Sequence, residues 1–534
     1  MINNKTILIV LSILFLVIAI PRIIFPDLDH GDDWADADIL IAANNFAKFG
    51  FIKTRFLPFF EAEIDAPKGP YLHYPPLGTI INGGLRILFK NDALYLFRGF
   101  ALFFSLLNLL FWYLFIKRFS GSVFFAFLAG VFYLFNPFFI YGADSLGQIS
   151  YADSFRSAIL FVFIVFIDAV PKRKSPVLLL LWSLFFLESL ISYEYILYLF
   201  LFFILFKIIF KVKKDSLSFK SILVLFSAPV CGFLLHFLQN IWYLGNISLV
   251  LQDFRKIALE RIGASQDSAF ALTISNWWQQ VLTRNFSLVL IFNYFLLFLG
   301  LFAAYLFYQR LSVKYRRQIN LNLRLLLVLG TCGISWYTVF PSHALAHAYV
   351  LFLVRHLLPV AALVFALFFY VAFFFIKETI RYKFLASAFL AGLALFVLFS
   401  AVTRSDLAVT PGNIQRAKDF LVFKECLAKL RKVSTDNDVV AINYYRRPFV
   451  SHYTGHNAVA IFDKAALEVL PRLPRYFIFL PYNDQRAAQL AGYLKEKYKL
   501  IFECQSSRFP SSFWELKPHE ESKIQILPNP NPLP

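Results

Sequence analysis

The chain has 534 residues and a formal net charge of +19 at pH 7, yet only 16% of its residues are charged and 59% are hydrophobic. A soluble globular protein carries roughly 25% charged residues and far fewer phenylalanines than the 67 found here. The composition therefore excludes an ordinary soluble protein. The lysines and arginines are concentrated in short segments between apolar runs, a distribution typical of membrane proteins and not of nucleic-acid binding.

Apolar runs of about 20 residues recur along the first ~400 positions, and this length is needed to cross roughly 30 Å of hydrocarbon. They predict a polytopic α-helical membrane protein with about 11 transmembrane helices. We place these spans near residues 6–26, 94–116, 121–141, 156–170, 176–192, 195–210, 221–241, 286–308, 325–342, 353–376 and 384–402.

The basic segments between spans predict the orientation. With this assignment, Lys5 and the basic groups at 117–118, 172–174, 211–214, 314–317 and 377–383 all fall on one side. The positive-inside rule makes that side, and the N-terminus, cytoplasmic, and the odd number of spans places the C-terminus outside. We expect an uncleaved first span, because Pro21 and Arg22 follow it where a cleavage site would have small residues. The expected location is a plasma (inner) membrane.

Three domains are expected. Residues 1–402 would form the transmembrane domain, in which the segments 27–92, 142–155 and 242–285 are too polar to face lipid and form outer loops. A shorter outer segment lies near 343–349. Residues 403–520 would form a small extracytoplasmic α/β domain, and residues 521–534 a proline-rich tail.

The α/β prediction rests on alternating strand and helix patterns. DVVAIN, YFIFL and KLIFE have the apolar character of short buried strands, whereas IQRAKDFLVFKECLAKLRK and NDQRAAQLAGYLKEKY have helical spacing. Cys426 and Cys504 both lie in this domain, where a disulfide is chemically permitted, but the sequence leaves their pairing open. His452, His456, Arg446 and Arg447 either contact an acceptor or form a solvated surface.

The first outer loop begins with the acidic stretch HGDDWADADILIAANNF, residues 30–46. Its apolar residues recur at helical spacing, which predicts a helix that lies in the membrane interface with one apolar stripe. The stripe consists of Ala35, Ile39, Ala42, Phe46 and Phe49. Asp36 and Asp38 would flank it at the membrane-facing edges, and Asp33 would lie at the helix start. The alternative is a capped helix with a solvated acidic face.

Other outer segments also carry chemically capable side chains. His73 and Tyr74 precede the stiff Pro75-Pro76 pair, and Asp153 lies in the second outer loop, where it either acts in a site or caps a helix. The late segment SHALAHAYVLFLVRHLLP carries His343, His347, Tyr349, Arg355 and His356. Arg355 and His356 lie at or inside a span, where an ionisable side chain is a functional-site candidate because charge there is costly. Glu188 and Glu194 either line the same cavity or are interface residues.

These motifs resemble those of the GT-C membrane glycosyltransferases, a superfamily that includes protein O-mannosyltransferases and lipid A aminoarabinose transferases. The first loop of one bacterial branch is similar to W-R-Q-A-D-T-x-x-I-A-R-N-F, and here residues 34–38 (WADAD) and 41–46 (IAANNF) stand at that position. Residues 74–77 (YPPL), 152–154 (ADS) and 347–349 (HAY) resemble later motifs of that branch. The departures are Ala35 and Asn44 in place of arginines and Asp36 in place of glutamine.

The resemblance implies an inverting sugar transfer at the outer face of the membrane. The donor would be a polyprenyl-phosphate-linked sugar from the bilayer, and the acceptor a glycan, lipid or protein. Asp36 or Asp38, with Asp33 third, would act as general base, and Asp153 would orient the sugar or acceptor. The implied contacts to the donor phosphate come from Arg355, His347, His73 and Tyr349.

Three questions stay open at this point. Asp36, Asp38 and Asp153 are oxygen ligands suited to Mg²⁺ or Mn²⁺, but cationic side chains can stabilise a phosphate leaving group without a metal. A transporter or flippase of lipid-linked saccharides would explain the spans but not readily the acidic loop. A scaffold of a cell-envelope complex is a further alternative. No nucleotide-binding motif is present, and no nucleic-acid partner is expected.

Overall fold

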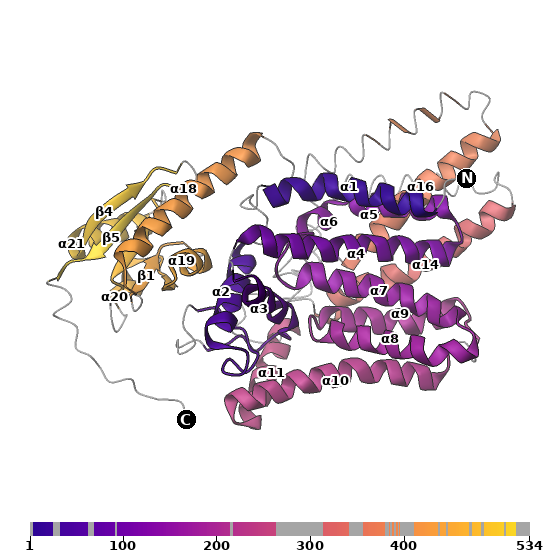
Figure 1. Ribbon diagram of the computed structural model, residues 1–534, viewed down its shortest axis with the longest axis horizontal. Helices are drawn as coiled ribbons and strands as arrows, with labels where there is room; N and C mark the ends of the chain where they lie inside the picture. Colours follow the sequence, from indigo (N-terminus) through magenta and orange to yellow (C-terminus); the bar gives the residue numbers. More distant parts are fainter. Residues whose placement is uncertain are drawn as a thin grey trace. The chain divides into compact units, whose positions relative to one another are not determined.

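The computed structural model of the chain contains a large helical part and a smaller part built around a sheet (Figure 1). It describes residues 4–24, 33–61, 69–90, 93–213, 217–262, 313–340, 356–379, 411–435, 438–444, 447–468, 473–481, 485–506 and 509–518, with a few residues between 384 and 395. The chain divides into two compact units. We call Met1–Pro26, Leu72–Gly78 and Ala93–Ala408 the bundle unit, and Asp27–Tyr71, Thr79–Asp92 and Val409–Pro534 the sheet unit.

The bundle unit consists of helices. They are α1 (Asn4–Ile24), α4 (Leu94–Ser120), α5 (Val123–Leu134), α6 (Pro137–Gly142), α7 (Gln148–Asp168), α8 (Pro171–Ser189), α9 (Glu194–Ile209), α10 (Phe219–Leu244), α11 (Ile247–Ile262), α14 (Val313–Val339) and α16 (Leu358–Thr379). Among the described residues, 6 helices are long and apolar enough to cross a membrane: α1, α4, α7, α10, most of α14 and most of α16.

The predicted spans match these helices closely in some places and less in others. The predicted span 121–141 is interrupted, because α5 ends at Leu134 and Pro137, which has no N–H to donate, begins the short helix α6. The helices α8 and α9 correspond to predicted spans, but α9 has only 16 residues and α8 begins with a basic segment. The predicted span 286–308 lies outside the described residues and 384–402 largely does, so the total of about 11 stays a prediction.

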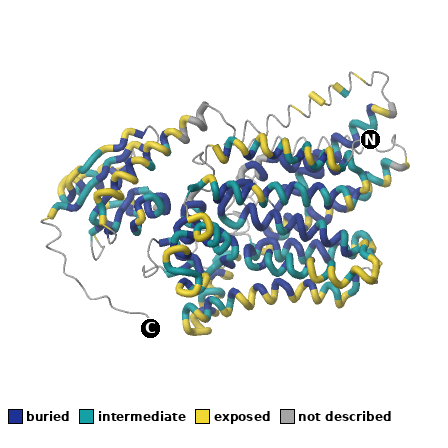
Figure 2. Tube along the Cα trace, in the orientation of Figure 1, coloured by how far each residue is buried: buried dark blue, intermediate teal, exposed yellow. Residues whose placement is uncertain are grey.

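The helices differ in how deeply they are buried (Figure 2). In α7, 83% of the spanning window is buried, compared with 28% in α1 and in α10. Helix α7 is therefore central to the bundle, and polar side chains on it contact other helices instead of solvent or lipid.

One end of the bundle carries the basic segments. The start of α1 meets the end of α4, where the Tyr113 hydroxyl donates to Asn4 Oδ1 at 2.6 Å. At the same end Arg118 of α4 lies 3.0 Å from Asp168 at the end of α7. The ring of Phe119 contacts the ring of Phe210 just after α9, so the end of α9 lies here too. Aromatic contacts also join the start of α5 and the start of α14 to the end of α16 at this end. We call it the basic end; which side of a membrane it meets stays a prediction.

The sheet unit combines the first acidic segment with the C-terminal segment. Its helices are α2 (Asp33–Phe49), most of α3 (Leu77–Phe89), α18 (Pro411–Val433), α19 (Arg447–Thr454), α20 (Lys464–Glu468) and α21 (Gln485–Lys497). Its strands are β1 (Val439–Ile442), β2 (Asn457–Ala460), β3 (Tyr476–Phe479), β4 (Tyr498–Cys504) and β5 (Ser511–Leu516).

The acidic stretch forms helix α2, as the spacing predicts, but the expectation of a single buried stripe is wrong. Leu40, Ile41 and Ala43 lie off the stripe and are buried as well. Part of the reason is the close approach of α3: a Cβ atom at Gly83 would lie 2.9 Å from Cβ of Phe46. Helix α2 is thus enclosed on several sides, and its position at a membrane interface stays a prediction.

The five strands form one mixed sheet in the order β2-β1-β3-β5-β4. Strands β2, β1 and β3 are parallel, and β5 is antiparallel to both β3 and β4. Side chains alternate between its faces: Val440 and Ile442 pack with residues of α18, whereas Ala441 packs with residues of α20 and α21. The three predicted strands and two predicted helices are confirmed, and β2 and β5 are additional.

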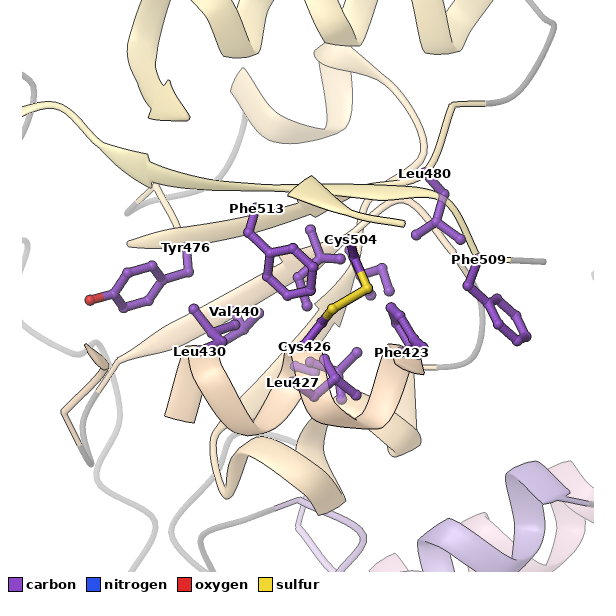
Figure 3. Packing of buried hydrophobic residues seen from close by; sticks show 14 residues of the cluster. Phe423, Cys426, Leu427, Leu430, Val440, Tyr476, Leu480, Cys504, Phe509 and Phe513 are labelled. Carbon is purple, nitrogen blue, oxygen red and sulfur yellow. A yellow bond between two sulfur atoms is a disulfide. The ribbon is translucent and has the colours of Figure 1, made fainter. Parts of the chain in front are cut away.

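The core on the α18 side contains a disulfide (Figure 3). Cys426 of α18 and Cys504 of β4 are bonded, with their Cα atoms 6.1 Å apart. Phe423, Leu427 and Phe513 belong to the same core. The bond joins a helix to the edge of the sheet across 78 residues of chain, so it restricts the unfolded sheet unit strongly.

Replacing Cys426 by Ser should lower the stability of the sheet unit by about 2–4 kcal/mol, because the unfolded chain regains the freedom that the bond removes. In denatured, unreduced wild-type protein, maleimide labelling followed by mass spectrometry should modify Cys231 and Cys332 only. The control is Cys231→Ser, which should lose one label and keep its melting temperature. Labelling of all four cysteines without reduction would contradict the disulfide.

Candidate active site

The end of the bundle unit opposite the basic end gathers buried polar and aromatic side chains. They come from α7, from the start of α9, from the end of α14 and from the residues just before α16. An ionisable side chain at such a place is costly unless it is paired, and it usually marks a site for a ligand or for catalysis. The residues concerned are Asp153, Arg156, Glu194, Tyr195, Trp336 and His356, which we call the buried cluster.

Arg156 is the centre of the buried cluster. Its side chain is fully buried, and its Nη1 atom lies 3.3 Å from Asp153 Oδ1, one helical turn earlier on α7. The same carboxylate oxygen accepts a hydrogen bond from the Tyr195 hydroxyl, and the guanidinium lies over the Tyr195 ring at 4.6 Å. Arg156 Nη2 donates to the Tyr133 hydroxyl at 2.9 Å, and Tyr133 in turn donates to Asn108. Helices α4, α5, α7 and α9 are therefore joined around one guanidinium.

Glu194 and His356 extend the cluster. Glu194 Oε2 lies 3.7 Å from His356 Nε2, and both side chains are almost completely buried. The other oxygen of Glu194 accepts a hydrogen bond of 3.1 Å from the Tyr74 hydroxyl. The His356 ring lies 4.8 Å from the ring of Tyr195 and is stacked on that of Trp336 with an interplanar angle of 6°. The Glu194–His356 pair is thus connected to the Arg156–Asp153 pair through the ring of Tyr195.

The segment 72–77 is held against this end of the bundle. The backbone oxygen of Leu72 is 3.0 Å from His236 Nε2 and accepts from Asn240 at 3.2 Å, both on α10. The Leu77 amide donates to the Leu190 carbonyl at 3.0 Å, in the turn between α8 and α9. These bonds fix the stiff Pro75-Pro76 segment and place Tyr74 over Glu194.

His73 lies at the outer side of this segment, 3.5 Å from Asp253 of α11, and is partly exposed. Burial lowers the pKa of its imidazole, Asp253 opposes that shift, and the positive charge of Arg261 adds to it. Burial therefore favours the neutral form of the imidazole, which can still donate a hydrogen bond. A fixed positive charge is nearby, because the Arg261 guanidinium lies 4.7 Å from the ring of Tyr74.

A second buried ion pair lies at the same end. Asp144 accepts from Arg22 of α1 at 2.7 Å and lies 3.2 Å from Arg98 of α4. Arg22 also donates to the carbonyl of Ile140. Two arginines and one carboxylate are enclosed together, which ties α1 and α4 to the chain just before α7.

The predicted site residues are distributed over both units. Asp153 and His73 lie in the bundle unit, but Asp153 lies within α7, and its predicted position in a loop is wrong. The span prediction began too late because the polar residues of QISYADSFR lower the local hydropathy, although they face other helices. Asp36 is buried and Asp38 is half-buried, both on α2 of the sheet unit. Arg355, His347, Tyr349 and the side chain of Asp33 lie outside the described residues.

Tyr195, Tyr133 and Trp336 were not predicted as site residues. Their rings lie in strongly apolar helices, where an aromatic residue usually packs with lipid or with other helices. The structure brings no group of three metal-ligating side chains together among the residues it describes.

Comparison with known proteins identifies the fold. The chain superposes on the crystal structure of ArnT from Cupriavidus metallidurans bound to undecaprenyl phosphate, with a TM-score of 0.55 and 12% identity over 94% of this chain and 97% of that one. It also superposes on the oligosaccharyltransferase of Archaeoglobus fulgidus, with a TM-score of 0.52 and 13% identity over 89% and 69% of the two chains. Both are GT-C fold enzymes, and this chain has the GT-C fold. No protein-family model and no curated protein sequence matches it.

The position of His356 depends on a close approach between α14 and the start of α16. A Cβ atom at Gly333 would lie 2.8 Å from the His356 carbonyl oxygen, whereas one at Gly330, a turn earlier, would meet nothing within 4 Å. Gly333→Ala should therefore lower stability by about 1–3 kcal/mol through overpacking. Gly330→Ala should be neutral or stabilising by up to about 1 kcal/mol, because alanine favours the helix. Melting temperatures of the purified variants check this, and equal values for the two variants would contradict it.

Proposed function

We propose that the protein is a glycosyltransferase that moves a sugar from a polyprenyl-phosphate donor to an acceptor at the outer face of the membrane. The main support is the fold, which it shares along nearly its whole length with an ArnT structure that holds undecaprenyl phosphate. The buried cluster agrees with this proposal, because paired carboxylate, guanidinium and imidazole groups at one end of a membrane bundle suit a phosphate-bearing lipid.

The proposed reaction is an inverting displacement. A hydroxyl or amine of the acceptor forms a bond to C1 of the sugar, while the bond between C1 and the phosphate oxygen breaks. The acceptor proton goes to a carboxylate, and the leaving group is polyprenyl phosphate, which keeps both electrons of the broken bond. Catalysis then requires a base beside the acceptor and hydrogen-bond donors or cations beside the departing phosphate.

The general base is assigned to Asp36 or Asp38, with Asp33 as the third candidate. Successive helical residues are rotated by about 100°, so the side chains of Asp36 and Asp38 leave α2 roughly 160° apart. One acceptor can therefore face only one of them. Asp153 is engaged by Arg156 and Tyr195 through a single oxygen atom, so its proposed role is to position Arg156.

The phosphate contacts are assigned to Arg355, His347, Tyr349 and His73. Arg355 precedes His356 in the chain, and His356 belongs to the buried cluster. Burial lowers the pKa of His73 and favours its neutral form, which would contribute a hydrogen bond to the phosphate. In this proposal the basic end is cytoplasmic and the sheet unit extracytoplasmic, in a plasma (inner) membrane, where the donor enters laterally from the lipid and the acceptor from the water.

Asp36→Asn and Asp38→Asn test the base. We expect one of them to lose transfer by about 10²–10⁴-fold, the range typical of a general base, and the other to lose less than about tenfold. The assay supplies purified protein with labelled polyprenyl-phosphate hexoses and pentoses and measures the polyprenyl phosphate released.

Asp168→Asn is the matched control, since it removes the same charge from an exposed ion pair at the basic end and should keep full activity. Full activity in both Asp36 and Asp38 variants would contradict the assignment. Passage of lipid-linked sugar across proteoliposomes without any transfer would instead support a transporter.

A further inference from the structure

The sheet unit contains a cleft of about 750 Å³ that the proposed chemistry does not use. It lies where the ends of α2 and α3 meet the end of α18, helix α19 and the turn before β2. A cleft of this size holds a ligand of one or two sugar rings with substituents.

The charged side chains that line the cleft are all positive. Four of its lining side chains are cationic: Lys48, Arg86, Lys90 and Arg431. None of the described residues that line it has a carboxylate side chain. Four cations converge from three helix ends that are distant in the sequence, so their mutual repulsion favours an anionic ligand that neutralises them.

The inner wall of the cleft is polar and tightly held. His456 is 3% exposed, and its Nε2 atom lies 2.6 Å from the Ser434 hydroxyl. The Thr454 hydroxyl donates to the Val450 carbonyl, and Ser451 accepts from the Ala458 amide, so both side chains are fixed. Lining of this kind suits a polar ligand, because hydroxyl and imidazole groups serve as hydrogen-bond partners.

Two arginines of the cleft come from different helices, α3 and α18. Arg86 donates from Nε to Asn44 Oδ1 at 2.7 Å, which fixes the position of its guanidinium. Arg431 lies beside Gly455, whose φ of 76° belongs to the left-handed region, and a Cβ atom there would contact the guanidinium at 3.9 Å. Guanidinium groups match the oxygen atoms of phosphate in two-point contacts.

We propose that this cleft binds a phosphate or pyrophosphate group of the acceptor. The identity of this ligand as the acceptor rests on the proposed transferase function, whereas the binding of phosphate to the cleft does not. Phosphate fits better than a single carboxylate, because only a multiply charged group balances four cations. The acceptor class is then a phosphate-bearing saccharide or a phosphate-bearing lipid headgroup, which share this chemistry.

The test is calorimetric titration of inorganic pyrophosphate into the full-length protein in nanodiscs of neutral phosphatidylcholine at low ionic strength. Arg431→Gln and Lys48→Gln should each raise the Kd about tenfold, since a hydrogen bond to a charged group contributes about 1.5–3 kcal/mol. The control is the double variant of Lys429 and Lys432 to Gln, which removes two exposed cations of the same helix outside the cleft. Its Kd should stay within about twofold of wild type.

Absence of pyrophosphate binding to the wild type, or equal weakening in cleft and control variants, would overturn the proposal. Titration of glucose 1-phosphate and of short-chain phosphatidic acid distinguishes the two sources, since the tighter ligand identifies a soluble saccharide or a lipid. The titration contains no sugar donor, so a failure to bind pyrophosphate leaves the transferase proposal standing. Failure of sugar transfer would in turn leave the binding result intact.

Discussion

The buried ion pair of Arg156 and Asp153 is the interaction on which this end of the bundle depends. A guanidinium enclosed among apolar helices is tolerated only if its charge and its donors are satisfied, because an unpaired buried charge is strongly destabilising. Here the neighbouring helices supply part of what is needed: the ring of Tyr195 comes from α9 and the hydroxyl of Tyr133 from α5. The requirement fixes the position of α7 relative to both, and Glu194 and His356 are buried together beside Tyr195. The same packing that stabilises the bundle therefore assembles the polar groups that the proposed donor would contact.

Hydropathy predicted the six long apolar helices found among the described residues of the bundle, because length and apolar composition are the main physical demand of the bilayer. It misplaced the start of α7, since it cannot distinguish a polar residue that faces water from one that faces another helix. The cost of charge inside a span drew attention to His356, which is buried beside Glu194. The sequence did not point to Tyr195 and Trp336 in this way, because they lie in helices of ordinary apolar composition. Contacts between helices that are distant in the sequence determine their role.

In the sheet unit, β1, β3 and β4 were predicted from their branched and aromatic residues, whereas β2 (NAVA) and β5 (SSFWEL) were not. The helical spacing of the acidic stretch also gave helix α2 correctly. Its enclosure could not be predicted, because α3 packs against it only through the absence of a side chain at Gly83. The cleft could not be predicted from the sequence either. His452 and His456 stood out as a local cluster, but Lys48 and Arg86 join them from segments more than 300 residues away in the chain.

The most direct test of the central claim is the position of the lipid phosphate in a cryo-EM structure of the protein with bound undecaprenyl phosphate. The phosphate should lie at the end of the bundle formed by the start of α9 and the start of α16. We expect it within hydrogen-bond distance of at least one of the assigned residues, Arg355, His347, Tyr349 and His73. A phosphate bound at the basic end, or a bundle that holds no lipid phosphate at saturating concentration, would contradict the assignment of the buried cluster to the donor site.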